Sequence, residues 1–431
     1  MDIPFSSSPR ASLGIEWELQ LVDSETRQLR SGASEILAEM EPAPGVEHPK
    51  AKHELLESTI EVITGVCTTV AEATEDLHRT VVEVAERAGT RGLGLLCAGS
   101  HPFTDPATQD ISPNPRYQKL VEDMQWLARR LQIFGVHVHV GVRSPDKVIP
   151  IVNALTAYVP HFLALSASSP YWEGTDTGLA SCRSKVFEGL PTAGLPYQLA
   201  GWSQFEDFMG TLIASETISS IKEVWWDIRP HPTYGTVEMR VCDGLPTLSE
   251  VGMIAALTQC LVQRFDSQLD QGYQLPNPLQ WVTRENKWRA ARYGLDASVV
   301  LDPAGSQRPL RELLPELVAE LMPTAERIGC ATELQRVQEV AAAGSSADRQ
   351  RAVAAAAGGD LVAVVDALLT EMRTDAPVRP AVAAPDVAGA GAGVVAVAGA
   401  DVAVVGADVA AAGADVAVVG GAGVAVAGAA G

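Results

Sequence analysis

Apolar residues recur along this chain with two different periods. In some segments they alternate with polar residues, which predicts strands with one buried face at 13–22, 92–99, 134–142 and 235–243. In longer segments they recur every three or four residues, which predicts helices at 68–89, 114–135, 144–165 and 247–270, with further helices from 281 onward. Long helical stretches separate the strands, so the pattern predicts one mixed α+β domain.

Three of these strands carry two charged or titratable side chains each, on the face opposite their apolar residues. The pairs are Glu16 and Glu18, His137 and His139, and Glu238 and Arg240. Two ionised carboxylates at this spacing lie about 6.6 Å apart and repel by roughly 2.5 kcal/mol at an effective dielectric near 20. One such strand is typical of a solvated face. Three such strands indicate a sheet whose second face carries carboxylates, imidazoles and a guanidinium group. This face, here called the polar floor, suits divalent cations and charged substrates. For the two histidines alone, a solvated or hydrogen-bonded pair explains the pattern as well as metal ligation.

A further acidic segment, 52–66, contains Glu54, Glu57 and Glu61. Glu54 and Glu61 are two helical turns apart and would share one face of a helix, whereas a regular strand without a bulge would send them to opposite faces. The local sequence leaves both structures open. An exposed acidic helix face is the simplest interpretation of this segment alone, and a contribution to the polar floor is the alternative.

Two arginines could complement a floor of carboxylates. Arg183 lies in the Gly- and Ser-rich stretch "GLASCRSKVFEGLP", and Arg229 lies between aromatic residues and prolines in "WWDIRPHPTYG". A guanidinium group binds carboxylates and phosphates through two parallel hydrogen bonds, so an arginine beside such a floor suits a substrate clamp. A surface salt bridge is the alternative explanation for Arg183.

Charge and cysteine usage narrow the class of protein. The 431 residues carry a formal net charge of -21, which argues against a nucleic-acid or anionic-membrane partner. The six cysteines are scattered without a C-x-x-C pair, so neither a zinc site nor a disulfide framework is predicted. The N-terminus has no secretory leader pattern, and no convincing apolar run of membrane-spanning length is evident. These features predict a soluble, cytoplasmic protein.

Composition changes sharply near residue 376. From there to residue 431 the chain consists almost wholly of Ala, Val and Gly with occasional Asp, and "GAD" recurs at a seven-residue step. Such a segment buries little area per residue, so ordering it costs more entropy than its packing returns. The sequence therefore predicts a domain at 1–375 followed by a disordered tail at 376–431.

The order of several motifs resembles a known family, the ATP-dependent carboxylate-amine ligases, also called type 2 glutamate-cysteine ligases. The motifs are "GIEWE", "HELLESTIEVITG", "FGVHVHVG", "LASCRSKVFEGLPTAG", "WWDIRPHPTYGTVEMRVCD" and "ENKWRAARYG". The resemblance runs from about residue 12 to 373. It implies a catalytic domain similar to that of glutamine synthetase, in which a curved, mainly antiparallel sheet is backed by helices.

The resemblance also implies roles for particular residues. It assigns metal binding to Glu16, Glu18, Glu54, Glu61, His137 and Glu238. It places Arg229 with four of these residues, Glu16, Glu18, His137 and Glu238, around the bound ATP. Arg183 and Arg240 are expected to hold the substrate carboxylate or the transferring phosphoryl group. The roles of His139 and Glu57 stay open.

The implied reaction uses ATP and two or three Mg²⁺ ions. A substrate carboxylate attacks the γ-phosphorus to give an acyl phosphate, and an amine then displaces phosphate to form an amide. The expected partners are small carboxylates and amines of the amino-acid type, and the resemblance is compatible with a homodimer. Neither common phosphate-binding glycine loop occurs in the sequence. The alternatives are a metal-dependent hydrolase on the same floor and a binding protein that keeps the fold without catalysis.

Overall fold

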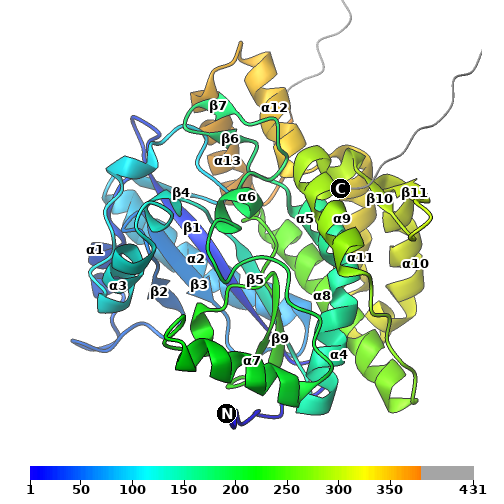
Figure 1. Ribbon diagram of the computed structural model, residues 1–431. Coiled ribbons are helices and arrows are strands. Elements are labelled where there is room, and N and C mark those ends of the chain that lie inside the picture. Colours follow the sequence, from blue (N-terminus) through cyan, green and yellow to red (C-terminus); the bar gives the residue numbers. More distant parts are fainter. Residues whose placement is uncertain (380–431) are drawn as a thin grey trace, which may run out of the picture. The chain divides into compact units, whose positions relative to one another are not determined.

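The computed structural model describes residues 1–379, and its centre is an antiparallel sheet of seven strands (Figure 1). These strands are β1 Leu13–Asp23, β2 Ala51–His53, β3 Thr59–Ile63, β4 Leu93–Leu96, β5 Val136–Gly141, β8 Ile228–His231 and β9 Thr236–Met239. Two small hairpins lie apart from it, β6 Tyr171–Trp172 with β7 Thr175–Asp176 and β10 Ser298–Val300 with β11 Gln307–Pro309. The predicted α+β class and mainly antiparallel sheet are confirmed.

The strand order is β2-β3-β1-β5-β9-β8, with β4 paired to the end of β1. All four predicted strands exist, although three of them are shorter than predicted. The neighbouring strands β8 and β9 form a hairpin that the sequence pattern did not predict. Its turn closes at Gly235, whose φ of 63° lies in the left-handed region that favours glycine.

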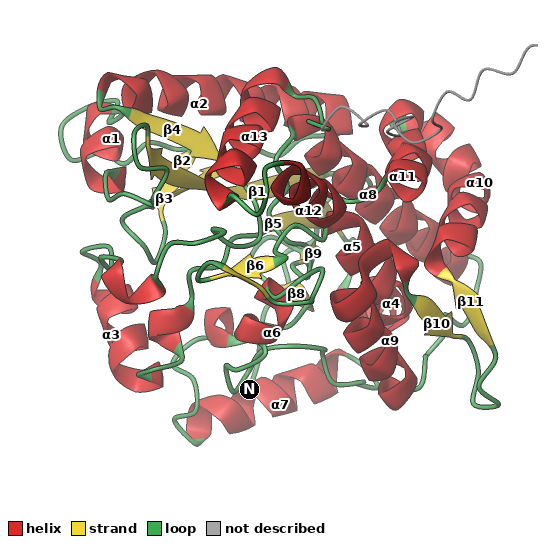
Figure 2. Cartoon of the chain, turned by 90° about the horizontal axis from the view of Figure 1, so that it is seen from above, coloured by secondary structure: helices red, strands yellow, loops and turns green. Residues whose placement is uncertain are grey.

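Helices cover the sheet and extend away from it (Figure 2). They are α1 Ala33–Glu39, α2 Val70–Thr90, α3 Pro115–Met124, α4 Pro145–Leu155, α5 Val159–Ser166, α6 Arg183–Phe187, α7 Trp202–Ala214, α8 Leu248–Asp270, α9 Gln280–Tyr293, α10 Leu310–Ile328, α11 Ala331–Ala343, α12 Ser346–Ala356 and α13 Leu361–Thr374. The two longest, α2 and α8, begin at threonine caps: Thr69 accepts the N–H of Glu72, and Thr247 accepts that of Glu250.

The core lies between the sheet and the helices α2, α4 and α8. Ile15, Trp17 and Leu19 of β1 are almost fully buried there, as their alternation with polar residues predicted. The indole N–H of Trp17 donates to the carbonyl of Leu245 at 3.1 Å, so the ring is buried without losing its hydrogen bond. Burying these side chains on one face leaves Glu16 and Glu18 on the other.

Two helix predictions were wrong in extent. The helix predicted at 114–135 ends at Met124, because Gln125 has a positive φ of 50° and residue Ile133 pairs with Ser100. The segment predicted at 144–165 is helical but changes from α-helix to a 3-10 turn between α4 and α5. Contrary to expectation, Pro145–Ser166 is long and apolar enough to cross a membrane, yet 72% of its most apolar window is buried in the structure.

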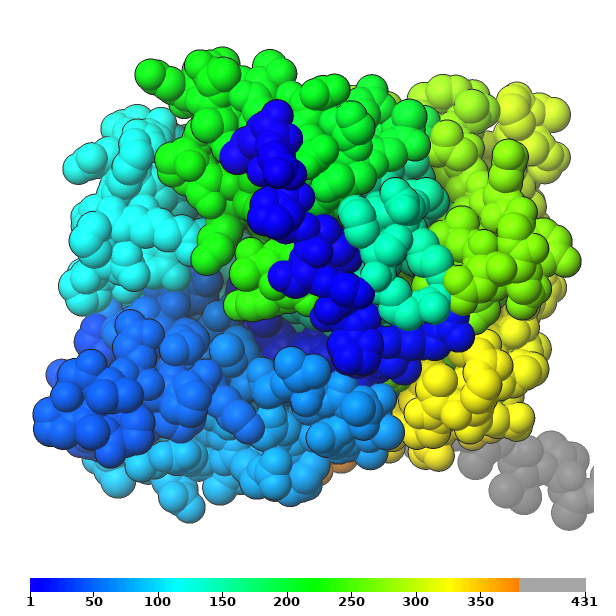
Figure 3. Space-filling view, turned by 90° about the horizontal axis from the view of Figure 1, so that it is seen from below, coloured from blue at the N-terminus to red at the C-terminus, as the bar shows by residue number. Residues whose placement is uncertain are grey.

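The N-terminal residues, blue in Figure 3, run across one face of the molecule. The amide of Ser6 donates to the carbonyl of Pro232 at 2.9 Å, and the amide of Ser8 donates to Val142 at 3.1 Å. The backbone of Ser6 approaches Gly235 so closely that a Cβ at that position would overlap it. This segment therefore fixes the β8–β9 turn from outside.

The last helix among residues 1–379, α13, packs against β4 and ends at Thr374. The tail predicted from residue 376 lies outside the described residues, apart from residues 376–379. The proposed boundary between the domain and the tail stays a prediction.

Candidate active site

The register of the central strands gathers the predicted carboxylates and imidazoles on one face of the sheet. Glu18 of β1 lies opposite Glu61 of β3, and Glu16 lies opposite His137 of β5. Because partners in register point to the same face, these residues from distant parts of the sequence become neighbours. On the next strand pair, His139 lies opposite Glu238 of β9 in the same way.

Glu54 joins this group from the loop between β2 and β3, and Glu61 joins it from β3 itself. Neither residue lies on a helix, so the helical alternative for segment 52–66 is wrong. Both side chains line the same cleft, since the loop turns the chain back between them. Glu57 points elsewhere and accepts a hydrogen bond from the hydroxyl of Ser34 at 2.6 Å.

Two overlapping groups of side chains have the spacing of metal-binding sites. Glu16, His137 and Glu238 form one group, and Glu18, Glu61 and His137 form the other; within each group the possible ligand atoms lie within 4.8 Å of one another. His137 belongs to both. The sheet thus presents possible metal-ligand atoms in two overlapping groups.

The carboxylates of the second group are crowded and lack cationic partners. Burial, and then the charge of Glu54, raises the pKa of Glu18 to about 8. Burial, and then the charge of Glu16, raises the pKa of Glu61 well above its usual value. Within residues 1–379, no Lys or Arg forms an ion pair with Glu18, Glu54 or Glu61. The charges of Arg183 and Arg240 offset the shift of Glu18 only in part, so a bound cation would stabilise the ionised form of this group.

Two histidines of β5 contact the carboxylate of Glu16, which lies on β1. The Nδ1 atom of His137 lies 3.0 Å from one carboxylate oxygen of Glu16, and the Nε2 atom of His139 lies 3.1 Å from the other. Burial acts to raise the pKa of Glu16, but the charge of His139 and then the hydrogen bond from His137 hold it well below its usual value. Burial, and then the cation Arg240, lowers the pKa of His137 to about 4, so this ring is neutral near pH 7 and can bind a metal.

Glu238 is fully buried beneath the cleft and is held by two arginines. Arg229, opposite it on β8, donates from Nε at 2.8 Å, and Arg240 donates from Nη1. Burial acts to raise the pKa of Glu238, but the charges of Arg229 and Arg240 outweigh it and lower the pKa. Since both guanidinium groups also line the cleft, Glu238 orients them toward any ligand there.

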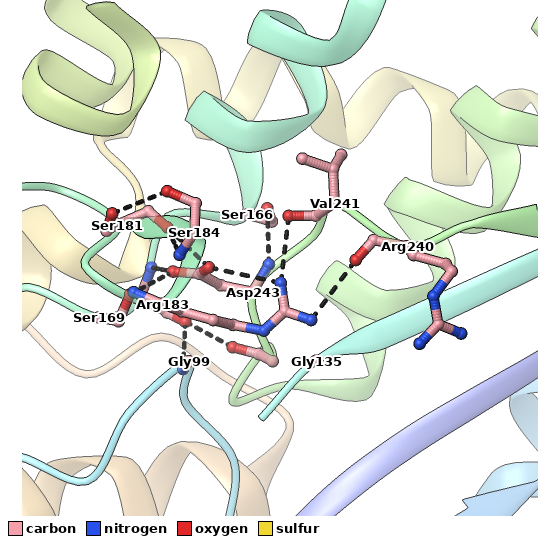
Figure 4. A network of polar contacts seen from close by, with 12 residues as sticks. Gly99, Gly135, Ser166, Ser169, Ser181, Arg183, Ser184, Arg240, Val241 and Asp243 are labelled. Carbon is pink, nitrogen blue, oxygen red and sulfur yellow. Dashed lines mark hydrogen bonds and ion pairs between the residues drawn. The ribbon is translucent and has the colours of Figure 1, made fainter. Parts of the chain in front are cut away.

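Arg183 reaches the cleft from the start of α6 (Figure 4). Its guanidinium donates to the carbonyls of Val241 at 3.3 Å and Arg240 at 3.4 Å, and the side chain of Arg240 extends away from it. A Cβ on Gly135 would lie 2.3 Å from the guanidinium, so only glycine permits this approach. The carboxylate of Asp243 lies 4.0 Å from the guanidinium of Arg183 and forms an ion pair with it. Two serine hydroxyls donate hydrogen bonds to the same carboxylate.

All of these predicted site residues except Glu238 line one cleft of about 620 Å³, within the usual range for small-molecule sites. Its far wall comes from α3, which contributes Arg116, Tyr117 and Lys119. At the other end lie His231 and Tyr234, whose rings stack with centroids 4.1 Å apart. The site therefore combines an acidic floor with cationic and aromatic walls.

A model of glutamate-cysteine ligase family 2 matches residues 12–367 of the chain. The chain belongs to this family. Relatives are provisionally named as glutamate–cysteine ligase 2 enzymes: one from Frankia casuarinae is 62% identical over 88% of this chain and 99% of its own length. Another, from Thermobifida fusca, is 58% identical over 88% of this chain and 94% of its own length. The family expected from the motifs is confirmed.

Solved structures support the fold. A glutamate–cysteine ligase from Francisella tularensis in complex with AMP aligns with a TM-score of 0.65 at 12% identity, covering 86% of this chain and 90% of that chain. A bifunctional glutathione synthetase from Pasteurella multocida aligns with a TM-score of 0.61 at 16% identity, covering 84% of this chain and 52% of that chain. The ligase fold of the family is thus present over most of this chain.

The donor set of the floor fits the Mg²⁺ ions that this family's chemistry requires. Carboxylate oxygens are the protein ligands that Mg²⁺ prefers, and Glu18 and Glu61 offer partly buried oxygens that form no ion pair with Lys or Arg in residues 1–379. Burial, and then the charge of Glu54, raises the pKa of Glu18, and a cation bound beside it would oppose both effects. The observation supports metal binding by this floor without fixing the number of ions.

The walls of the cleft were not predicted from the sequence. Arg116 and Lys119 lie in a segment that was interpreted only as a helix, although "NPRYQKL" places two basic residues three apart on one helical face. His231 ends β8 and Tyr234 lies in the turn of the unpredicted β8–β9 hairpin. The sequence signal for that turn was Pro232 followed three residues later by Gly235.

Proposed function

We propose that this protein uses ATP to join a small carboxylate to an amine through an acyl-phosphate intermediate. The observation that carries the proposal is the pair of adjoining metal-type groups on the sheet with Arg183 and Arg240 beside them in one cleft. Phosphoryl transfer depends on positioning and on stabilising negative charge, and this cleft supplies acidic ligands next to fixed cations.

Each part of the cleft has a defined task in this proposal. Glu16, Glu18, Glu54, Glu61, His137 and Glu238 would hold two or three Mg²⁺ ions. Bound there, the ions would supply positive charge at the phosphates of ATP. Arg183 and Arg240 stabilise the charge that develops on the transferring phosphoryl oxygens, and Arg229 holds Glu238 in place while facing the nucleotide. The carboxylate of the substrate is itself the nucleophile, so no protein nucleophile is required.

Glutamate and cysteine are the first substrate pair to test, because the relatives carry the name glutamate–cysteine ligase 2. The experiment measures ADP release by the purified protein with ATP, Mg²⁺ and a panel of amino acids and amines, and identifies the product by mass. We expect release that requires Mg²⁺, one carboxylate and one amine. A hydrolase would instead release phosphate without an amine, and release that survives both Glu18→Gln and Arg240→Ala would contradict the ligase mechanism.

Two finer statements belong to the same proposal. We place the protein in the cytoplasm, since its six cysteines are all buried and free, as is usual in a reducing compartment. The homodimer expected from the family resemblance stays a prediction, and sedimentation of the purified protein would test it.

A further inference from the structure

Lys287 of α9 is a buried cation that belongs to none of the groups described above. Its side chain is 2% exposed, and its Nζ atom lies 2.6 and 2.8 Å from the two carboxylate oxygens of Asp227 and 2.6 Å from Glu188. Burial acts to lower the pKa of Lys287, but Asp227 and then Glu188 outweigh it and raise the pKa, so the ammonium group stays charged. A charge this deeply buried is stable only with such partners.

The two carboxylates belong to the two segments that carry the arginines of the cleft. Asp227 immediately precedes β8, and its carbonyl accepts the backbone N–H of Arg240 at 2.8 Å. Glu188 directly follows α6, which begins at Arg183. One ammonium group therefore ties the segment of Arg183 to the segment of Arg240.

Lys287 acts from outside the cleft. None of Lys287, Asp227 and Glu188 is among the residues that line the cleft, so the ammonium group touches no ligand bound there. Its influence on a bound phosphoryl group passes through the two segments that carry Arg183 and Arg240 and through the charge of Asp227, which interacts with Arg183. Removing Lys287 would break the link between the two segments: among residues 1–379, Asp227 would lose its ion pair, whereas Glu188 would keep Lys185, 2.7 Å away on α6.

We infer that Lys287 is a positioning residue that fixes the separation of Arg183 and Arg240 across the reacting phosphoryl group. This inference rests on the proposed ligase function. A shift of about 1 Å in a positioning group can lower turnover by about 100-fold, so even a partial displacement of either arginine is measurable. Because ground-state contacts to ATP come from the whole cleft, turnover changes more than the apparent affinity for ATP.

Arg349 provides a matched control. It is a second buried cation held between two carboxylates, with Glu250 at 2.9 Å and Glu371 at 2.8 Å, and its side chain is 4% exposed. Arg349 and both of its partners lie on α12, α8 and α13, and none of the three lines the cleft or bonds to an arginine of the cleft. Loss of Arg349 repeats the electrostatic damage without its connection to Arg183 and Arg240.

The experiment compares Lys287→Met and Arg349→Met with the wild type by thermal unfolding and by steady-state ADP release with saturating carboxylate and amine. We expect both variants to unfold at lower temperature. Lys287→Met should lose about 10-fold or more in kcat with a change of less than about 3-fold in KM for ATP. Arg349→Met should keep the wild-type kcat per folded molecule.

Three results overturn the inference: an unchanged kcat in Lys287→Met, an equal loss of kcat in both variants, or a loss confined to KM. If Lys287→Met does not fold, Glu188→Gln replaces it, since that side chain is 30% exposed and tolerates substitution better. A lower kcat is then expected, and an unchanged kcat overturns the inference. A wild type without Mg²⁺-dependent ADP release contradicts the proposed function itself, which distinguishes the two failures.

Discussion

Two clusters of acidic residues in this protein have opposite surroundings. The cleft cluster comprises Glu16, Glu18, Glu54 and Glu61, which line the cleft, and Glu238, which is buried beneath it; in residues 1–379 only Glu238 among them pairs with arginine. The helix-end cluster comprises Asp266 and Asp270 near the end of α8, with Arg10, Arg143 and Lys147 around them. One cluster has more carboxylates than cations, and the other has more cations than carboxylates.

The surroundings of the two clusters shift the pKa of their carboxyl groups in opposite directions. Burial raises the pKa of Glu18 to about 8, and Glu54 reinforces the shift. Burial also acts to raise the pKa of Asp266, but hydrogen bonds from Lys147 and then Arg10 outweigh it and lower the pKa. A carboxylate that the protein neutralises contributes to stability, whereas one that it leaves without a cation is available to a ligand. The surroundings of an acidic residue therefore separate the two roles better than its type.

The largest expected effect comes from the cleft cluster. Replacing Glu18 with Gln removes an anionic ligand from the group Glu18, Glu61 and His137, so we expect ADP release to fall by about 100-fold or more. Unfolding of the metal-free variant at pH 9 should occur at the same temperature as the wild type or higher, because one repulsive charge is gone. Kinetics and thermal unfolding on one preparation measure both. A Glu18→Gln variant with wild-type turnover would contradict the proposal that the cleft cluster serves ligand binding and the helix-end cluster serves stability.

The helix-end cluster should respond in the reverse way. Replacing Asp266 with Asn leaves three cations around Asp270 alone, and we expect the free energy of unfolding to fall by about 2 kcal/mol. Urea unfolding measures this loss, and turnover at 25 °C should stay unchanged. Asp270→Asn is the control, with a smaller loss because its side chain is 40% exposed. Reduced turnover in a folded Asp266→Asn variant would contradict the separation of roles.

The pH dependence of that loss follows from the lowered pKa of Asp266. An acid with a lowered pKa in the folded state stabilises the protein above its unfolded pKa, here near 3.8, and loses this contribution as the pH falls through the folded pKa. The stability difference between the wild type and Asp266→Asn should therefore be constant above about pH 5 and shrink below about pH 4. Urea unfolding across this pH range measures the stability difference between the two proteins. A difference that grows as the pH falls would contradict the expected pH dependence.

The smallest expected effect concerns the C-terminal segment. A chain ending at Arg379 keeps both clusters and the hydrogen bond from the amide of Val378 to Glu371 at 2.8 Å. We expect its turnover and its unfolding temperature to match those of the full chain within error. A marked loss of either would show that residues 380–431 contribute to one of the two clusters or to assembly.

The sequence could predict the floor of the cleft because its signal is local. The alternation that buries Ile15 and Trp17 also fixes the direction of Glu16 and Glu18, and the same holds for His137. The placement of Glu54 and Glu61 could not be read locally, since it depends on pairing between β1 and β3 across more than forty residues. Nothing in the helical pattern of residues 115–124 says that α3 forms the wall opposite the floor.

The helix-end cluster could not be predicted from the sequence for the same reason. Its members come from the N-terminus, from the start of α4 and from the end of α8, and each alone is an ordinary charged residue. The buried pair of Lys287 and Asp227 was also missed, although "ENKWRAARYG" and "WWDIRP" both carried the family resemblance. A motif marks residues that matter together but does not reveal which of them touch.

The register of β1 restricts how this site can change in evolution. β1 pairs with β3 along one edge and with β5 and then β4 along the other, so its position is fixed from both sides. Inserting or deleting one residue within β1 would turn Glu16 and Glu18 into the core and Trp17 into the cleft. Relatives can therefore vary single residues of the cleft, but differences in chain length should be confined to loops such as 41–50, and never fall within this strand.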